Sequence, residues 1–341
     1  MSKRRVLTAT LAAGLVLSMG SAALAAPATR VLKQFKVPTA NSLPRAITNG
    51  SDGNRWFTES DNNVNFAKIA RITPSGAITE FDVTAADGCN SCGISDIAHG
   101  PGNILYITAN GGDLIRFNVS TLAFEPPVPI ATAERSASSV DSVAVSGSDV
   151  WISDFNADVV WRYNLSTQQF TTIDVIDPAD IAVDGAGDAW FAQSQHNPDG
   201  TSNIGRIDEG TGAVTDTFVV NAAAVDLTVS PVDGRVWFSA RFPNFLTSAE
   251  AGVGYVDPAD STSDFFPLPT NGPANIAAGA DGSIWFTQTL KGNAASITNA
   301  GVISEFKAVK GSGPEGIVVA PNGDPWYTML DANKIAALVT K

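Results

Sequence analysis

The sequence reads Ala46-Ile-Thr-Asn-Gly-Ser-Asp-Gly-Asn-Arg-Trp-Phe-Thr-Glu59 near its start and Asn275-Ile-Ala-Ala-Gly-Ala-Asp-Gly-Ser-Ile-Trp-Phe-Thr-Gln288 near its end. Both stretches have a short apolar strand, an Asp-Gly turn and a second strand with an aromatic pair. Asp-Gly supplies the positive φ angles of a tight hairpin turn. Segment 315–327 is a third copy, with Asn-Gly at the turn. The pattern therefore predicts a repeated β-hairpin.

The repeat continues along the whole chain. Aromatic residues mark the second strand of seven modules and follow one another at intervals of 39 to 50 residues: Trp56, Tyr106, Trp151, Trp190, Trp237, Trp285 and Trp326. This interval matches the length of one propeller blade. We therefore predict an all-β, seven-bladed β-propeller of four-stranded antiparallel blades.

The two ends of the chain are complementary. The seventh module, 314–341, is one strand short, whereas 31–38 precedes the first module and resembles an outermost strand. An N-terminal strand that completes the last blade would leave no blade incomplete. We expect this closure.

The N-terminus has the three parts of a secretory signal. Lys3, Arg4 and Arg5 precede the apolar run 6–20, and Ala23-Leu-Ala25 provides small residues for cleavage. A membrane anchor is the alternative, but the run is short of the ~20 residues that cross a bilayer. We predict a signal peptide over 1–25, a single propeller domain over 26–341, and a secreted or periplasmic protein.

Charge and cysteines limit the partners. The chain has 21 Lys+Arg against 34 Asp+Glu, a net charge of -13, and cleavage after residue 25 leaves -16. An acidic chain repels phosphate groups, so we expect no nucleic acid partner and no anionic membrane partner. We also expect no membrane insertion after cleavage, and a monomeric protein.

Cys89 and Cys92 are the only cysteines. Export favours a local disulfide between them over a redox or zinc motif.

Several motifs resemble those of one known family. Trp56-Phe-Thr-Glu59, Ile69-Ala-Arg-Ile72, Gly76-Ala-Ile-Thr-Glu-Phe81 and Asn203-Ile-Gly-Arg-Ile207 are similar to the repeats of the virginiamycin B lyase-like propellers. The resemblance implies enzymes that open a cyclic depsipeptide by β-elimination, with a magnesium ion and a catalytic histidine. The resemblance implies active histidines at the entry to the first strand of a blade and in loops after Trp-Phe-x-Glu. Here the entry positions contain no histidine: they are Arg45, Ser95, Asp141, Ala179, Val225, Ala274 and Glu315.

Polar residues mark the expected site. Loops that precede first strands and follow second strands meet at the mouth of a propeller channel, where ligands bind. The candidates for binding a ligand, or a Mg²⁺ or Ca²⁺ ion, are Arg45, Glu59, Asp141, Asp154, Asp180, Gln193, Asp226, Gln288 and Glu315. Each could instead cap a turn, as polar side chains often do. His99 is expected in a solvated turn on the opposite face.

Two functions remain open at this point. The first is binding of a small polar molecule, a peptide or a protein partner at the channel mouth, without histidine-dependent chemistry. The alternative is a divalent-cation-dependent lyase, cleaving a C–O bond of a cyclic ester or depsipeptide, or a lactonase-like hydrolase. Glu59 and His196 are then the catalytic candidates. At least three carboxylates within roughly 2.0–2.6 Å of one point would favour the alternative.

Overall fold

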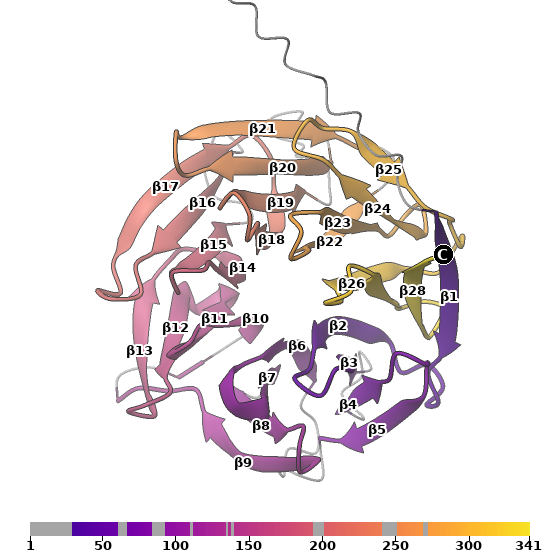
Figure 1. Ribbon diagram of the computed structural model, residues 1–341. Coiled ribbons are helices and arrows are strands. Elements are labelled where there is room, and N and C mark those ends of the chain that lie inside the picture. The colour runs from indigo at the N-terminus through magenta and orange to yellow at the C-terminus, as the bar shows by residue number, and fades with distance from the viewer. Residues whose placement is uncertain are drawn as a thin grey trace, which may run out of the picture.

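The computed structural model describes residues 29–60, 67–83, 93–109, 112–133, 136–137, 140–193, 201–240, 251–268 and 272–341. These residues form seven four-stranded antiparallel sheets arranged as a ring (Figure 1). The predicted all-β, seven-bladed propeller is therefore confirmed. In this part of the chain no helix is long and apolar enough to cross a membrane.

Each blade runs outward from the central axis. Blade 1 contains β2 (Pro44–Asn49), β3 (Arg55–Ser60), β4 (Ala67–Ile72) and β5 (Ile78–Asp82). Blade 2 contains β6 (Ile94–His99), β7 (Ile104–Ala109), β8 (Asp113–Asn118) and β9 (Ala123–Pro129), and blade 3 contains β10 (Val140–Val145), β11 (Asp149–Asp154), β12 (Val159–Asn164) and β13 (Gln169–Asp174). Blade 4 contains β14 (Pro178–Val183), β15 (Ala189–Gln193), β16 (Ser202–Ile207) and β17 (Val214–Val220).

The remaining blades follow the same order. Blade 5 contains β18 (Ala224–Val229), β19 (Val236–Ala240), β20 (Gly252–Asp257) and β21 (Thr262–Pro267), and blade 6 contains β22 (Pro273–Ala278), β23 (Ile284–Gln288), β24 (Asn293–Ile297) and β25 (Ile303–Glu305). Blade 7 contains β26 (Pro314–Val319), β27 (Pro325–Met329), β28 (Lys334–Thr340) and, as its outer strand, β1 (Arg30–Lys36). Two short 3₁₀ helices, η1 (Pro101–Asn103) and η2 (Phe155–Ala157), complete the described elements.

Aromatic residues of the second strands fill the space between neighbouring blades. The seven that mark the repeat are at most 5% exposed. Trp56 packs with Ile97, Ile107 and Phe117 of blade 2. Burial of such large apolar side chains is the main favourable contribution to folding. The hydrophobic core is therefore divided among the interfaces between blades, and each blade depends on both neighbours.

Every first strand carries an irregularity near its start. Pairing with the second strand shifts register in all seven blades, in β2 between Pro44 and Ile47. In blade 1 the hydroxyl of Thr58 accepts the N–H of Ala46 at this point, at 3.1 Å. In blade 7 Thr328 donates to the carbonyl oxygen of Arg45, in blade 1, at 2.6 Å. The bulge directs side chains toward the axis, and the hydroxyl holds it against the next blade.

The N-terminal strand closes the ring as predicted. β1 pairs with β28 from Arg30 opposite Thr340 to Lys36 opposite Lys334. The Arg30 guanidinium lies 2.9 Å from the Asp324 carboxylate. The ring of Phe35 stacks on Trp326, with centroids 5.6 Å apart. Strand pairing, an ion pair and aromatic packing together join the two ends of the chain.

Candidate functional site

A cavity of about 220 Å³ lies where the first strands converge. Its wall is formed by the second and third residues of these strands, which the bulges direct inward. Five of the residues predicted from the sequence line it: Arg45, Asp141, Asp180, Asp226 and Glu315. Asp96 is a further lining carboxylate.

Three lining carboxylates bind the backbone of the next blade. Asp96 accepts the N–H of Val143 at 2.9 Å, and Asp180 accepts the N–H of Leu227 at 2.6 Å. Asp226 accepts the N–H of Ile276 at 2.9 Å. All three occupy the third position of a first strand. Asp96 was not selected as a site residue from the sequence, although its position in the repeat matches Asp180 and Asp226.

Burial governs the protonation of these groups. It raises the pKa of Asp180 to about 7, and the negative charge of Asp96 contributes in the same direction. Burial also raises the pKa of Asp226 well above its ordinary value, and the charge of Asp180 adds to this effect. For Asp141, burial and then the charge of Asp154 raise the pKa to about 6. The cavity wall is therefore a strong acceptor of positive charge, protons included.

Other predicted site residues do not line the cavity. Asp154 accepts the N–H of Ala157 at 3.2 Å and the indole N–H of Trp161 at 3.1 Å, so it caps η2. Gln193 donates to the carbonyl oxygen of Ile176 and accepts from Asn203, both at 2.7 Å. These two side chains hold local structure.

Glu59 is the penultimate residue of β3, and Gln288 is the last residue of β23; both are fully buried. Within the described part of the chain, neither carboxylate oxygen of Glu59 and neither amide atom of Gln288 has a hydrogen-bond partner. The Ser42 hydroxyl, which lies near Glu59, donates to Asn333 at 2.9 Å. Burial raises the pKa of Glu59 to about 7.

The described residues do not fit a magnesium or calcium ion bound by carboxylates. Across the described ranges, no group of three or more His, Cys, Asp or Glu side chains could hold a metal ion. The lining carboxylates instead accept backbone N–H groups. The predicted catalytic residue His196 and the predicted disulfide partners Cys89 and Cys92 lie outside the described residues.

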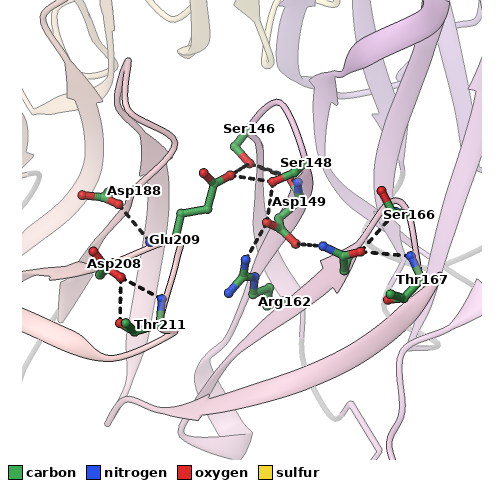
Figure 2. Close-up of polar contacts among 11 residues, drawn as sticks. Ser146, Ser148, Asp149, Arg162, Ser166, Thr167, Asp188, Asp208, Glu209 and Thr211 are labelled. Carbon is green, nitrogen blue, oxygen red and sulfur yellow. Dashed lines mark hydrogen bonds and ion pairs between the residues drawn. The ribbon is translucent and has the colours of Figure 1, made fainter.

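The opposite face of the ring carries a separate polar network between blades 3 and 4 (Figure 2). Glu209 accepts from the hydroxyls of Ser146 and Ser148 at 2.9 and 2.7 Å. Asp149 binds Arg162 at 2.7 Å. The Glu209 contacts join turns of adjacent blades, and the Asp149–Arg162 ion pair lies within blade 3, so the network has a structural role.

His99 also differs from its expected position as a solvated turn residue. It is the last residue of β6 and is half-buried, and its buried Nε2 has no partner among the described residues. Burial lowers the pKa of His99. It lies at the far end of the first strand from the cavity residues.

Comparisons with solved structures identify the same architecture in three lyase structures. A streptogramin B lyase superposes with a TM-score of 0.74 at 24% identity, over 92% of this chain and 98% of that chain. Virginiamycin B lyase from Staphylococcus aureus gives 0.73 at 20% identity, over 91% and 99%. A catalytically inactive variant of that enzyme with quinupristin gives 0.74 at 20% identity, over 91% and 99%. These similarities establish the fold.

The sequence itself matches a family description over nearly its whole length. Among curated proteins, no sequence relative was found. The profile of the virginiamycin B lyase family matches residues 27–198 and 128–341, which together span all seven blades. The chain belongs to the virginiamycin B lyase family.

Proposed function

We propose that this protein binds a small, positively charged polar ligand in its central cavity and does so without histidine-dependent lyase chemistry. The observation that carries the proposal is the composition of the cavity wall. Five carboxylates line it, from Asp96, Asp141, Asp180, Asp226 and Glu315, against the single guanidinium of Arg45. Carboxylates at the base of a concave site concentrate the electric field and attract cations.

The size of the cavity supports a small ligand. At about 220 Å³ it lies below the roughly 300–1,000 Å³ of sites that enclose drug-sized molecules. An amine or guanidine of a few heavy atoms fits this space, whereas a macrocyclic depsipeptide does not. The entry positions of the first strands also lack histidine, which supports binding without histidine-dependent chemistry; His196 remains the candidate base of the alternative.

Thermal unfolding of the chain from residue 26 tests the proposal. Putrescine, agmatine and choline would be compared with glycerol and glutarate at matched ionic strength. We expect a saturable rise in Tm with one or more of the cations. The rise should be measurable, because a ligand at ~100 times its Kd stabilises the folded state by about 2.7 kcal/mol. We expect the affinity to fall from pH 7.5 to pH 5, because Asp180 and Asp141, with pKa values of about 7 and 6, then take up protons.

A pair of variants locates the effect. Asp141→Asn with Glu315→Gln removes two charges from the cavity and should abolish the shift. Asp264→Asn with Glu125→Gln removes the same charges from outer strands and should preserve it. Stabilisation by Mg²⁺ or Ca²⁺ after EDTA treatment, and by no organic cation, would contradict the proposal and favour the metal-dependent lyase or lactonase alternative.

We also propose that the protein is exported and that residues 1–25 are removed. The support is the order of charged, apolar and small residues at the N-terminus. The mass of the protein recovered outside the cytoplasm tests this, and a mass that includes residues 1–25 would contradict it. An oxidised Cys89–Cys92 pair and a monomeric state remain predictions on the same basis.

A further inference from the structure

One outer strand of the ring differs from the others in what it leaves uncovered. β17 is the last strand of blade 4 and pairs only with β16, so in the described part of the chain no strand lies along its other edge. It also exposes two large apolar side chains, Val214 and Val219, at 42% and 62% of their surface. An open edge with unpaired N–H and C=O groups and exposed valines is a template for another β-strand.

The outer strands of the other blades carry features that prevent such pairing. β9 contains three prolines, β25 has only three residues, and β1 carries three cations. β5, β13 and β21 carry acids and expose no large apolar side chain. β17 has no proline, lysine or arginine, and its one acid, Asp216, lies 2.5 Å from the Arg206 guanidinium. Of the seven described outer strands, β17 is therefore the least protected.

A groove runs beside this strand, between blades 4 and 5, and we call it the β17 groove. It consists of two hollows of about 410 and 350 Å³, which adjoin because Val219 and Ser263 line both of them. β17 forms one side, and β21, on the outside of blade 5, forms the other (Figure 1). Each hollow falls within the roughly 300–1,000 Å³ that is typical of binding sites.

The floor of the β17 groove is aromatic. Phe238 of β19 and Phe265 of β21 line it and stack with ring centroids 6.1 Å apart. They lie against β20 where it has glycine: a Cβ at Gly254 would come within 2.6 Å of the Phe238 ring, and one at Gly252 within 2.6 Å of the Phe265 ring. The two glycines therefore make room for a flat apolar surface, on which side chains of a partner can pack.

Charge at the groove favours a basic partner. Asp216 and Asp264 line it, and none of the described lysines and arginines does. Asp264 is exposed and makes no ion pair within the described ranges. A second copy of the chain would bring the same acids and a net charge of -13 to the groove, whereas basic side chains complement them.

We propose that β17 and the β17 groove bind an extended basic segment of another protein by β-strand addition. The segment would pair with the open edge of β17 and extend the sheet of blade 4 outward, held by backbone hydrogen bonds. Because successive side chains of a strand point to opposite faces, one row of them would enter the groove. There, apolar groups would meet the aromatic floor and basic groups would meet Asp264.

Binding of labelled peptides to the chain from residue 26, measured by fluorescence anisotropy, tests this inference. The probe is a peptide that alternates valine with lysine and threonine, and a second peptide has glutamate in place of lysine. A third keeps the side chains of the probe but carries a methyl group on each backbone nitrogen, so it cannot donate ladder hydrogen bonds. We expect saturable binding of the probe, at least about tenfold weaker binding of the methylated peptide, and none of the glutamate peptide.

A pair of protein variants locates the site. Val219→Lys should weaken binding of the probe at least about tenfold, because lysine blocks an edge strand and repels a basic peptide. Thr171→Lys adds the same charge at an exposed position of β13, in the neighbouring blade, and should bind as the wild type does. Circular dichroism establishes that both variants are folded. Hydrogen exchange should slow in β17, and not in β13, when the probe binds.

The proposal has clear contrary outcomes. Failure of the probe to bind, equal binding of the methylated or glutamate peptide, or equal binding by Val219→Lys would overturn it. Sedimentation tests the other occupant of the edge. Self-association of the wild type that Val219→Lys abolishes would assign the edge to a second copy of the chain and would also overturn the proposal.

Discussion

Two glutamates of blade 1 have opposite protonation behaviour, although they lie near the same lysine. Burial raises the pKa of Glu59 to about 7. Burial also acts to raise the pKa of Glu80, because it disfavours the charged form. Hydrogen bonds from Thr39 and Lys68 outweigh this effect, so the pKa of Glu80 is lowered. The Glu80 carboxylate lies 3.0 Å from Lys68 Nζ. The contrast shows that hydrogen-bond partners, more than residue type, decide which form is stable.

Glu59→Gln should stabilise the protein at high pH. Between the ordinary pKa of 4.5 and about 7, the folded state retains a proton that the unfolded state has lost, so stability falls as pH rises through this window and stays lower above it. The neutral amide avoids this loss. We expect a gain of up to about 3 kcal/mol at pH 8 and none at pH 4, measured by urea unfolding.

Glu80→Gln is the matched control, with the opposite sign. A lowered pKa contributes stability above the ordinary pKa, and that stability disappears as pH falls through the folded pKa. The variant should therefore be less stable than the wild type at pH 8, and the difference should shrink in acid. A pH-independent effect at Glu59 would show that the carboxylate is not held as the structure indicates.

At the scale of elements, a hydroxyl on the second strand joins the bulge of its own blade to the next blade, as in blade 6. Thr287 accepts the N–H of Asn275 at 3.1 Å and donates to the carbonyl oxygen of Glu315 at 2.7 Å. Ser or Thr occupies this position in six blades, and blade 4 has Ala192. The third residue of the Trp-Phe-Thr motif is therefore explained by the joint between blades.

Thr287→Val tests this joint. Valine has nearly the same shape but leaves a partly buried N–H and a partly buried carbonyl without their partner, which costs about 1–3 kcal/mol. Thr79→Val, at an exposed position of β5, should change stability by less than about 0.5 kcal/mol. Chemical unfolding of both variants gives the comparison. A loss at Thr287 no larger than that at Thr79 would contradict the assigned role.

Predictability from the sequence differed between turns and site residues. Asp-Gly and Asn-Gly marked the hairpin turns correctly, since Gly53, Gly282 and Gly323 have φ values of 76°, 79° and 81°. Reasoning from the repeat also predicted that Asp154 and Asp226 both belong to the ligand site. Only Asp226 lines the cavity, because the bulge turns it inward, whereas Asp154 caps η2. A bulge leaves no mark in the residue types, so a local pattern does not distinguish the two.

At the scale of the whole molecule, charge distribution depends on closure of the ring. The segments 33–36 and 307–334 are almost a full chain length apart, and they meet only because β1 joins blade 7. A sum over the sequence predicts repulsion from every anionic surface. The folded ring instead brings lysines from both ends of the chain together in blade 7, which composition alone does not reveal.

Closure by an outer strand should be transferable to another blade. The N–H of Lys341 lies 3.1 Å from the carbonyl oxygen of Thr29, so a short glycine linker can join the two ends. Opening the chain between Pro74 and Ser75, in the exposed turn before β5, makes β5 the N-terminal strand that closes blade 1. We expect this permutant to keep the β-sheet circular dichroism spectrum and a Tm within several degrees. An unfolded permutant would mean that the closing position is specific to blade 7.

The strand that closes the ring also sets the order of events during synthesis. Of the described strands, β1 is made first and its partner β28 is made last. Until β28 is available, the nascent chain must carry β1 without its neighbour, and blade 1 without a complete blade 7 beside it. The other six blades are therefore synthesised before the ring can close.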